Sequence, residues 1–282
     1  SNNAVGYDAL GANTTANQNN AFGRFSLGSN TTGADNTAFG QNTLGTNILG
    51  SKSTAVGSDA LATQNYASAT DGYNTAVGYN AGAAVTTGTN NTLIGGLAGD
   101  AITTGIQNTY VGKSSGSGTT TGARNTGIGS DALILLTTGS DNTAVGKNAL
   151  ETTTTASNNT AVGKSAGAAV TTGTNNTFVG FEAGDATDDG ARNTAVGKGA
   201  LSANCTNDNT AIGEGALGIT VGGNNTAVGR SAGASINSGS NNVCIGLETD
   251  GAHDSANSIT IGIGITGATN DFSFGKPSNV VK

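Results

Sequence analysis

The sequence of 282 residues contains no Trp, no Met, a single Pro and only 4% aromatic residues. Charged residues make up 10% of the chain, against ~25% in an average soluble domain. Large apolar side chains supply most of the burial that offsets chain entropy, so this composition argues against an ordinary globular core. Disorder is the obvious alternative, but disordered chains usually carry many Pro residues or a high net charge. Here the net charge is only −7.

Two classes of partner are disfavoured by what is missing. No stretch approaches the ~18 consecutive apolar residues of a membrane-spanning helix. The 11 Lys and Arg residues are outnumbered by 18 Asp and Glu residues, so the basic footprint of a nucleic-acid-binding protein is absent. We therefore expect neither membrane insertion of this segment nor a nucleic-acid partner.

What the sequence does contain is an internal repeat. The string Asn-Thr-Ala-Val-Gly, or a close variant, occurs sixteen times, and 47 residues are Gly. The glycines that close the string recur with a period of seventeen, which lengthens to twenty-one between Gly57 and Gly78 and shortens to sixteen at three later steps. They are Gly6, Gly23, Gly40, Gly57, Gly78, Gly95, Gly112, Gly129, Gly146, Gly163, Gly180, Gly197, Gly213, Gly229, Gly246 and Gly262.

A period of this length is too short for a helix pair or a propeller blade, but it fits one turn of a β-solenoid with two short strands and two corners. Frequent Gly and Thr residues also disfavour helices. The sequence predicts an all-β fold, a parallel β-solenoid (β-roll) of about sixteen 17-residue coils. The repeat rod is expected over residues 1–264, and a C-terminal cap or a junction to another domain over residues 265–282.

Comparison of the copies suggests a structural role for each position. The residue before the glycine is Val, Ile or Phe in all sixteen copies and is expected to face a dry interior. The residue four before it is Asn in fourteen copies, with Ser53 and Ser258 as exceptions, and is expected to form a hydrogen-bonded ladder. The glycine marks a corner that needs positive φ or close backbone approach. The representative repeat residues are Asn74, Val77, Gly78, Asn142, Val145, Gly146, Asn159, Val162 and Gly163.

Two further positions show a pattern across the copies. The residue two before the glycine is mostly Ala and is expected on the opposite side of the strand, where a long Ala-lined strip favours a homotrimer; tolerance of exposed Ala is the alternative. Four residues after the glycine stands Leu or Gly in the first fourteen copies. Where it is Gly82, Gly99, Gly167 or Gly233, a Val or Ile follows three residues later, which indicates that the two sites share one cavity. Gly116 and Gly184 depart from this rule.

The repeats resemble those of known surface proteins. Ala256-Asn257-Ser258-Ile259-Thr260-Ile261-Gly262 is similar to the head repeat of YadA-like trimeric autotransporter adhesins, and Asn142-Thr143-Ala144-Val145-Gly146 is similar to repeats in phage tail fibres. The resemblance covers nearly the whole chain, although the 17-residue period is longer than the coil of the adhesin heads. It implies three associated β-rolls. It also makes residues 272–282 similar to the junction before an intramolecular chaperone domain.

The function that these features favour is structural. We expect a rigid trimeric shaft or head of a phage tail fibre or virion surface fibre, extracellular and used for host attachment. A trimeric adhesin on a bacterial cell surface is the alternative. Ice binding is a less favoured one, since Thr-Thr pairs recur at many corners but form no strict Thr-x-Thr strand ladder.

The four-residue expansion between Gly57 and Gly78 contains the candidate receptor-binding residues. Loops that bulge from a rigid solenoid are common places for binding groups, and Tyr is a favoured contact residue for sugars and proteins. A host-surface glycan or protein receptor is the expected partner, and a neutral insertion with locally packed Tyr residues is the alternative. The candidates are Gln64, Tyr66, Asp71 and Tyr73.

No residue pattern indicates catalysis. The single His, His253, has no second His or nearby Cys to form a metal site. Cys205 and Cys244 lie about two coils apart and at different places in the repeat, so we expect free thiols rather than a disulfide. The sequence therefore predicts no enzyme, no cofactor and no metal.

Overall fold

The computed structural model describes residues 1–275, and the chain forms two compact units, Ser1–Asn142 and Thr143–Lys282. All regular secondary structure of the described residues is β-strand. The strands of the first unit are β1 (Asn3–Val5), β2 (Asn20–Phe22), β3 (Thr37–Phe39), β4 (Gly50–Ser51), β5 (Thr54–Val56), β6 (Thr70–Asp71), β7 (Thr75–Val77), β8 (Thr92–Ile94), β9 (Thr109–Val111) and β10 (Thr126–Ile128). Those of the second are β11 (Thr143–Val145), β12 (Thr160–Val162), β13 (Thr177–Val179), β14 (Thr194–Val196), β15 (Thr210–Ile212), β16 (Thr226–Val228), β17 (Val243–Ile245), β18 (Asp250–Gly251), β19 (Ile259–Gly262), β20 (Thr266–Gly267) and β21 (Phe272–Gly275).

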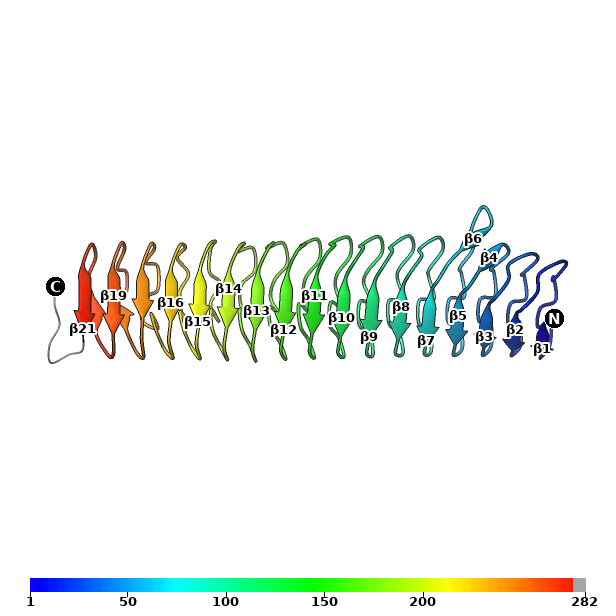
Figure 1. Cartoon of the computed structure of the whole chain (residues 1–282), viewed down its shortest axis with the longest axis horizontal. Coiled ribbons are helices and arrows are strands. Elements are labelled where there is room, and N and C mark those ends of the chain that lie inside the picture. Colours follow the sequence, from blue (N-terminus) through cyan, green and yellow to red (C-terminus); the bar gives the residue numbers. More distant parts are fainter. Residues whose placement is uncertain (276–282) are drawn as a thin grey trace. The chain divides into compact units, whose positions relative to one another are not determined.

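Within each unit the chain winds as a parallel β-solenoid (Figure 1). Each three-residue strand pairs in register with its counterpart one coil later, as Thr75 pairs with Thr92 and Val77 with Ile94. The prediction of a parallel solenoid of about sixteen coils is therefore confirmed.

The prediction of two strands per coil is wrong for most coils. A second short strand occurs only in the pairs β4–β6 and β18–β20 of the described chain. Elsewhere the far side of the coil consists of turns and bends. The reason is local: two residues and four residues after the corner, the backbone adopts positive φ, as at Asp59 (φ 58°) and Leu61 (φ 49°). An extended strand cannot continue through left-handed residues.

The inside and the outside of the coil are the reverse of the sequence-based expectation. The Ala two before the corner glycine is fully buried, as Ala55 and Ala76 show, whereas Val56 and Val77 beside them remain 37% and 36% exposed. The interior of each coil is narrow and is filled mainly by Ala, by Leu at the fourth position after the corner, and by the Asn ladder. Val77, Val145 and Val162 therefore lie on the outer face of the sheet.

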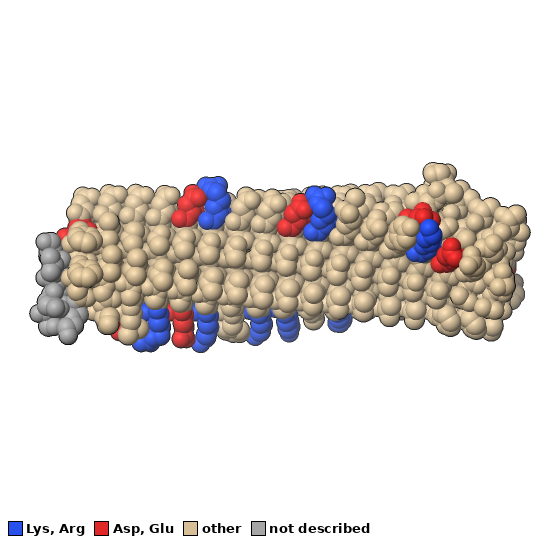
Figure 2. Space-filling view, viewed as in Figure 1, with Lys and Arg blue, Asp and Glu red and all other residues tan. Residues whose placement is uncertain are grey.

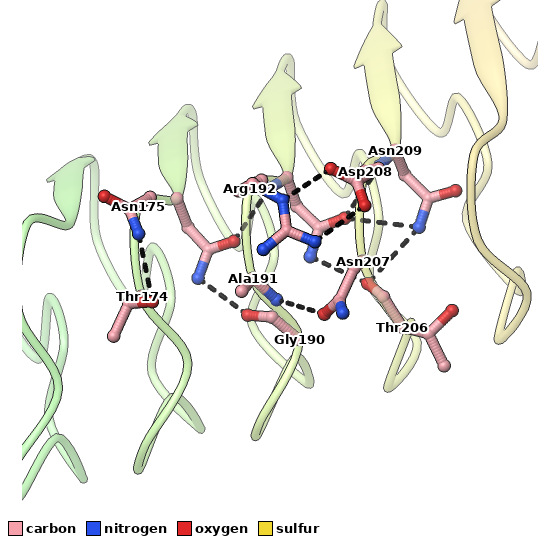
Figure 3. A network of polar contacts seen from close by, with 11 residues as sticks. Thr174, Asn175, Gly190, Ala191, Arg192, Thr206, Asn207, Asp208 and Asn209 are labelled. Carbon is pink, nitrogen blue, oxygen red and sulfur yellow. Dashed lines mark hydrogen bonds and ion pairs between the residues drawn. The ribbon is translucent and has the colours of Figure 1, made fainter.

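The Asn ladder is confirmed. In the first unit, the Asn108 side chain accepts a hydrogen bond from the Asn125 backbone N–H (3.0 Å) and donates one to the Gly122 carbonyl (2.8 Å). Asn74, Asn142 and Asn159 occupy the same buried position. Figure 3 shows the ladder in the second unit, where Asn209 donates to the Thr206 carbonyl beside the exposed corner residues.

The corner glycine is required by both conformation and space. Gly78 has φ 142°, and a Cβ there would lie 2.5 Å from the carbonyl oxygen of Gly95 in the next coil. Gly146 and Gly163 have φ 137° and 141° in the same role. The prediction of positive φ and close backbone approach is confirmed.

The shared cavity is also confirmed, and the exceptions to its rule have a physical cause. A Cβ on Gly82 would meet Leu93 at 2.6 Å and Val85 at 3.3 Å, so those side chains occupy the room that Leu takes in other coils. At Gly116 the ring of Tyr110 takes that room. At Gly184 the ring of Phe178 does the same, so no Val or Ile is needed three residues later.

The solenoid also continues past the expected boundary at residue 264. Strand β20 pairs with β18, and β21 pairs with β19 from Ile259–Phe272 to Gly262–Gly275. Residues 265–275 therefore complete another coil, and the remaining part of the expected junction, residues 276–282, lies outside the described residues.

Candidate functional site

The outer face of the sheet is the most regular apolar surface in each unit. It carries the side chain that precedes every corner glycine, and we call this row the Val/Ile column. Its most accessible members range from 36% exposed at Val179 to 58% at Val5, and the others are partly exposed. The column comprises Val5, Phe22, Phe39, Val56, Val77, Ile94, Val111 and Ile128 in the first unit, and Val145, Val162, Val179, Val196, Ile212, Val228, Ile245 and Ile261 in the second.

A second row runs beside it, because side chains two apart point to the same face of a strand. This Thr column is partly exposed and pairs residue by residue along the sheet. It comprises Thr37, Thr54, Thr75, Thr92, Thr109 and Thr126 in the first unit, and Thr143, Thr160, Thr177, Thr194, Thr210 and Thr226 in the second. Neither column contains a charged residue.

Charged side chains gather at the corners instead. In the view of Figure 2 they lie mainly along the two margins, with uncharged side chains between them. Arg124 holds Asp141 through two hydrogen bonds of 2.6 and 2.8 Å, and Arg192 holds Asp208 at 2.7 and 2.8 Å. Both pairs are exposed, and hydrogen bonding to the Arg lowers the pKa of each carboxyl group. They join successive coils at the corner that precedes the strand, five residues before the corner glycine, as Figure 3 shows for Arg192 and Asp208.

Half of the candidate receptor-binding residues are buried. Gln64 is 0% exposed and Tyr66 5%. They fill the place where Ser53 interrupts the Asn ladder: Gln64 accepts a hydrogen bond from Asn74 (2.9 Å), and Tyr66 donates one to the Gly88 carbonyl (3.0 Å). Burial raises the pKa of Tyr66 to about 12. Neither side chain is positioned to contact a receptor.

The other two candidates are accessible. The segment around β6 projects beyond the neighbouring coils (Figure 1). At its base Lys52 lies 2.6 Å from Asp71, and the Tyr73 hydroxyl donates to the same carboxylate at 3.2 Å. The Lys52 ammonium also lies 5.4 Å from the centre of the Tyr73 ring, which is 52% exposed. The structure thus brings together Asp71, Tyr73 and Lys52, and no feature of the repeat pattern marks Lys52 as part of this group.

The residues considered for metal and disulfide chemistry lie apart. Cys205 and Cys244 are free, as predicted, and both are buried. His253 is exposed beside Asp254. Within residues 1–275 no group of three or more His, Cys, Asp or Glu side chains is placed to hold a metal ion, and no pocket is formed. None of the described residues forms a helix long and apolar enough to span a membrane.

Comparison with known proteins adds no identity. No protein-family model matches the chain, and no curated protein matches it either.

Proposed function

We propose that this chain is a structural segment of an extracellular fibre or adhesin, and that copies of it associate as a homotrimer through the outer face of the sheet. The observation that carries the proposal is the Val/Ile column, in which ten of the sixteen apolar side chains are 36–58% exposed and the other six are partly exposed. Monomeric proteins rarely leave a long contiguous apolar surface in water.

The energetics of covering this column favour association. Complete burial of a Val or Ile side chain contributes about 1.5–3 kcal/mol, so covering the exposed two-fifths contributes on the order of 1 kcal/mol per residue. Association costs about 4–15 kcal/mol, and only a surface repeated over many coils exceeds that cost. The resemblance to trimeric adhesin heads and tail fibres favours three copies and a location on a virion or cell surface.

The mass of the chain in solution tests the association. Sedimentation equilibrium is expected to give the mass of three chains of 27.2 kDa each. A monomer at all accessible concentrations would overturn the proposal, because the Val/Ile column would then be stable in contact with water.

Host attachment in this proposal involves Lys52, Asp71 and Tyr73, which together form an exposed aromatic and charged surface at the base of a projecting segment. A host glycan or protein is the proposed ligand. Tyr73→Ala is expected to reduce binding to host cells or to a glycan array at least tenfold. Tyr79→Ala is the matched control, since Tyr79 is 60% exposed at a different corner of the repeat. If both variants bind as well as the unmodified chain, this surface is not the receptor-binding site.

Ice binding is a second candidate, and one observation favours it. The outer face presents Thr-x-Val in register on successive parallel strands, a regular array that the Thr-Thr corners alone did not suggest. Both candidates use the same face, so a trimer that covers the face excludes ice binding. Thermal hysteresis measured on the sample used for sedimentation decides between them: a freezing-point gap from a monomer favours ice binding, and its absence from a trimer favours the fibre.

A further inference from the structure

The outer face changes character in the last three main strands of the second unit. Strands β11–β16 begin with Thr, whereas β17, β19 and β21 begin with Val243, Ile259 and Phe272. These three residues pair with one another in register, as do Ile245, Ile261 and Phe274 beside them. The Thr column is therefore replaced by a second apolar column in these coils.

The corners of the same coils are apolar as well. Leu247 and Ile263 follow the corner glycines Gly246 and Gly262, where the other coils of the second unit carry Lys, Arg or Glu, except for Phe181. We call these eight residues the C-terminal patch. Six of them are exposed, namely Ile245 (39%), Leu247 (40%), Ile259 (41%), Ile263 (58%), Phe272 (52%) and Phe274 (51%), while Val243 and Ile261 are partly exposed.

The size of the patch suggests how it is used. The exposed halves of the two Phe side chains provide about 75–125 Å² each, and the whole patch about 400–500 Å². A contiguous apolar area of this size is typical of an interaction site. It is smaller than the roughly 800 Å² per partner of a stable interface, so the contact must extend along the adjoining Val/Ile column.

We propose that the C-terminal patch is the strongest part of the contact between copies of this chain. This inference rests on the proposed self-association. A second copy is the fitting occupant because the patch continues in register into the Val/Ile column of the same sheet. A like patch on each copy meets its counterparts around a symmetry axis, which gives a closed assembly. The nearby Glu248 is paired with Arg230 at 2.6 Å, so its charge does not oppose the contact.

The repeat itself supplies a conservative test. The triple variant Val243→Thr, Ile259→Thr, Phe272→Thr places in these strands the residue that β11–β16 already carry at the same position. It is expected to raise the concentration at which the assembly dissociates by about a hundredfold or more. The matched control is Val162→Thr, Val179→Thr, Val196→Thr, with three similar changes in the Val/Ile column of the same unit. Its expected effect is about tenfold or less.

Hydroxyl-radical labelling of the unmodified chain gives a readout that does not depend on the folding of a variant. Phe272 and Tyr73 are both 52% exposed in the single chain. In the assembly, Phe272 is expected to label several-fold less than Tyr73. Labelling of Phe272 as strong as that of Tyr73 would overturn the inference.

The outcomes separate the two proposals. If the unmodified chain is an assembly but the control variant dissociates as readily as the C-terminal variant, self-association stands and the role of the patch is refuted. If the unmodified chain is a monomer, both fail. Circular dichroism of each variant shows whether a loss of assembly reflects unfolding, in which case the labelling result decides.

Discussion

The Asn ladder makes a sharp stability prediction for the first unit, and Asn108→Ala is the change that tests it. The Asn108 side chain is fully buried and serves two neighbouring coils. It accepts hydrogen bonds from the Asn125 backbone N–H (3.0 Å) and side-chain amide (3.2 Å), and it donates to the Gly122 carbonyl (2.8 Å) and to Asn91 (3.2 Å). Truncation to Ala removes all four contacts.

The loss in the free energy of unfolding can be estimated from the buried polar groups that lose their hydrogen-bond partners. The Asn125 backbone N–H and the Gly122 carbonyl are both in buried residues, and each buried polar group without a partner costs about 1–3 kcal/mol. The Asn125 side chain keeps its bond to Gly139 (2.9 Å), and Asn91 keeps the Asn108 backbone N–H (3.0 Å). The expected loss in the free energy of unfolding is therefore about 2–6 kcal/mol, with a value near 4 most consistent with two orphaned groups.

Urea denaturation followed by circular dichroism measures this loss, on unmodified and variant chains at equal concentration because association shifts apparent stability. Thr109→Ala is the matched control, since Thr109 follows Asn108 but lies on the outer face. Its effect is expected to stay within about 1 kcal/mol. A loss below about 1 kcal/mol for Asn108→Ala would refute the reasoning, because it would mean that water or a backbone shift satisfies both groups.

Three other predictions concern single positions. Cys205 and Cys244 are 1% and 0% exposed, and burial raises the pKa of Cys244 to about 12, so a thiol reagent at pH 8 is expected to detect no thiol in the folded chain and two in denaturant; rapid reaction of the folded chain would contradict the packing. Burial, and then the charge of Glu182, raise the pKa of Asp185 above its usual range. A raised carboxyl pKa in the folded state means that stability falls as the pH rises from the unfolded pKa through the folded one. Asp185→Asn is therefore expected to raise the Tm at pH 7 and to lose that advantage near pH 3; equal gains at both pH values would exclude the charge as the cause. Gly163→Ala is expected to cost about 3 kcal/mol or more, because its Cβ would lie 2.6 Å from the Gly180 carbonyl carbon. Gly199→Ala, with φ 60° and no atom nearer than 3.8 Å, is its control and is expected to cost about 1–2 kcal/mol; similar losses would show that backbone contact is not the limiting factor.

The period, the corner glycine and the Asn ladder could be predicted from the sequence because each coil must repeat the backbone geometry of the one before it. The missing second strand could not. Asp59 and Leu61 adopt positive φ with ordinary side chains, and only the occasional Gly at these positions marks the conformation in the sequence. The residue types on the far side of the coil are therefore compatible with a second strand, although the left-handed backbone prevents that strand from forming.

The reversal of inside and outside has a different cause. Alternation along a strand assigns residues to two faces but does not say which face is buried, and side-chain size wrongly favoured Val. The sequence does contain a signal of which face is buried. Leu93, Tyr110 and Phe178 replace the Ala two residues before the corner glycine. In the coils that these large side chains contact, Gly stands at the fourth position after the corner. That exchange of volume places the Ala position inside the coil.

The buried candidates of the inserted segment carried a comparable signal. Ser53 interrupts the Asn ladder in the coil that immediately precedes Gln64 and Tyr66. The insertion supplies side chains that complete the ladder, since Ser53 and Asn74 both bond to Gln64. Of the four candidates, Asp71 and Tyr73, at the base of the projecting segment, remain exposed for contact with a ligand.

Two explanations are available for the Val and Ile residues of the Val/Ile column, namely strand propensity and burial. The residue types found on the outer face distinguish between them. Val, Ile and Thr all favour strands because they are β-branched, so propensity alone permits Thr in either column. The chain uses Thr at twelve positions of the Thr column and at none of the sixteen positions before a corner glycine. The residue before the corner glycine must therefore be apolar, in addition to being β-branched or aromatic. An apolar side chain at an outward-facing position is what the proposed self-association requires, and the replacement of Thr by Val243, Ile259 and Phe272 extends the same requirement across both columns.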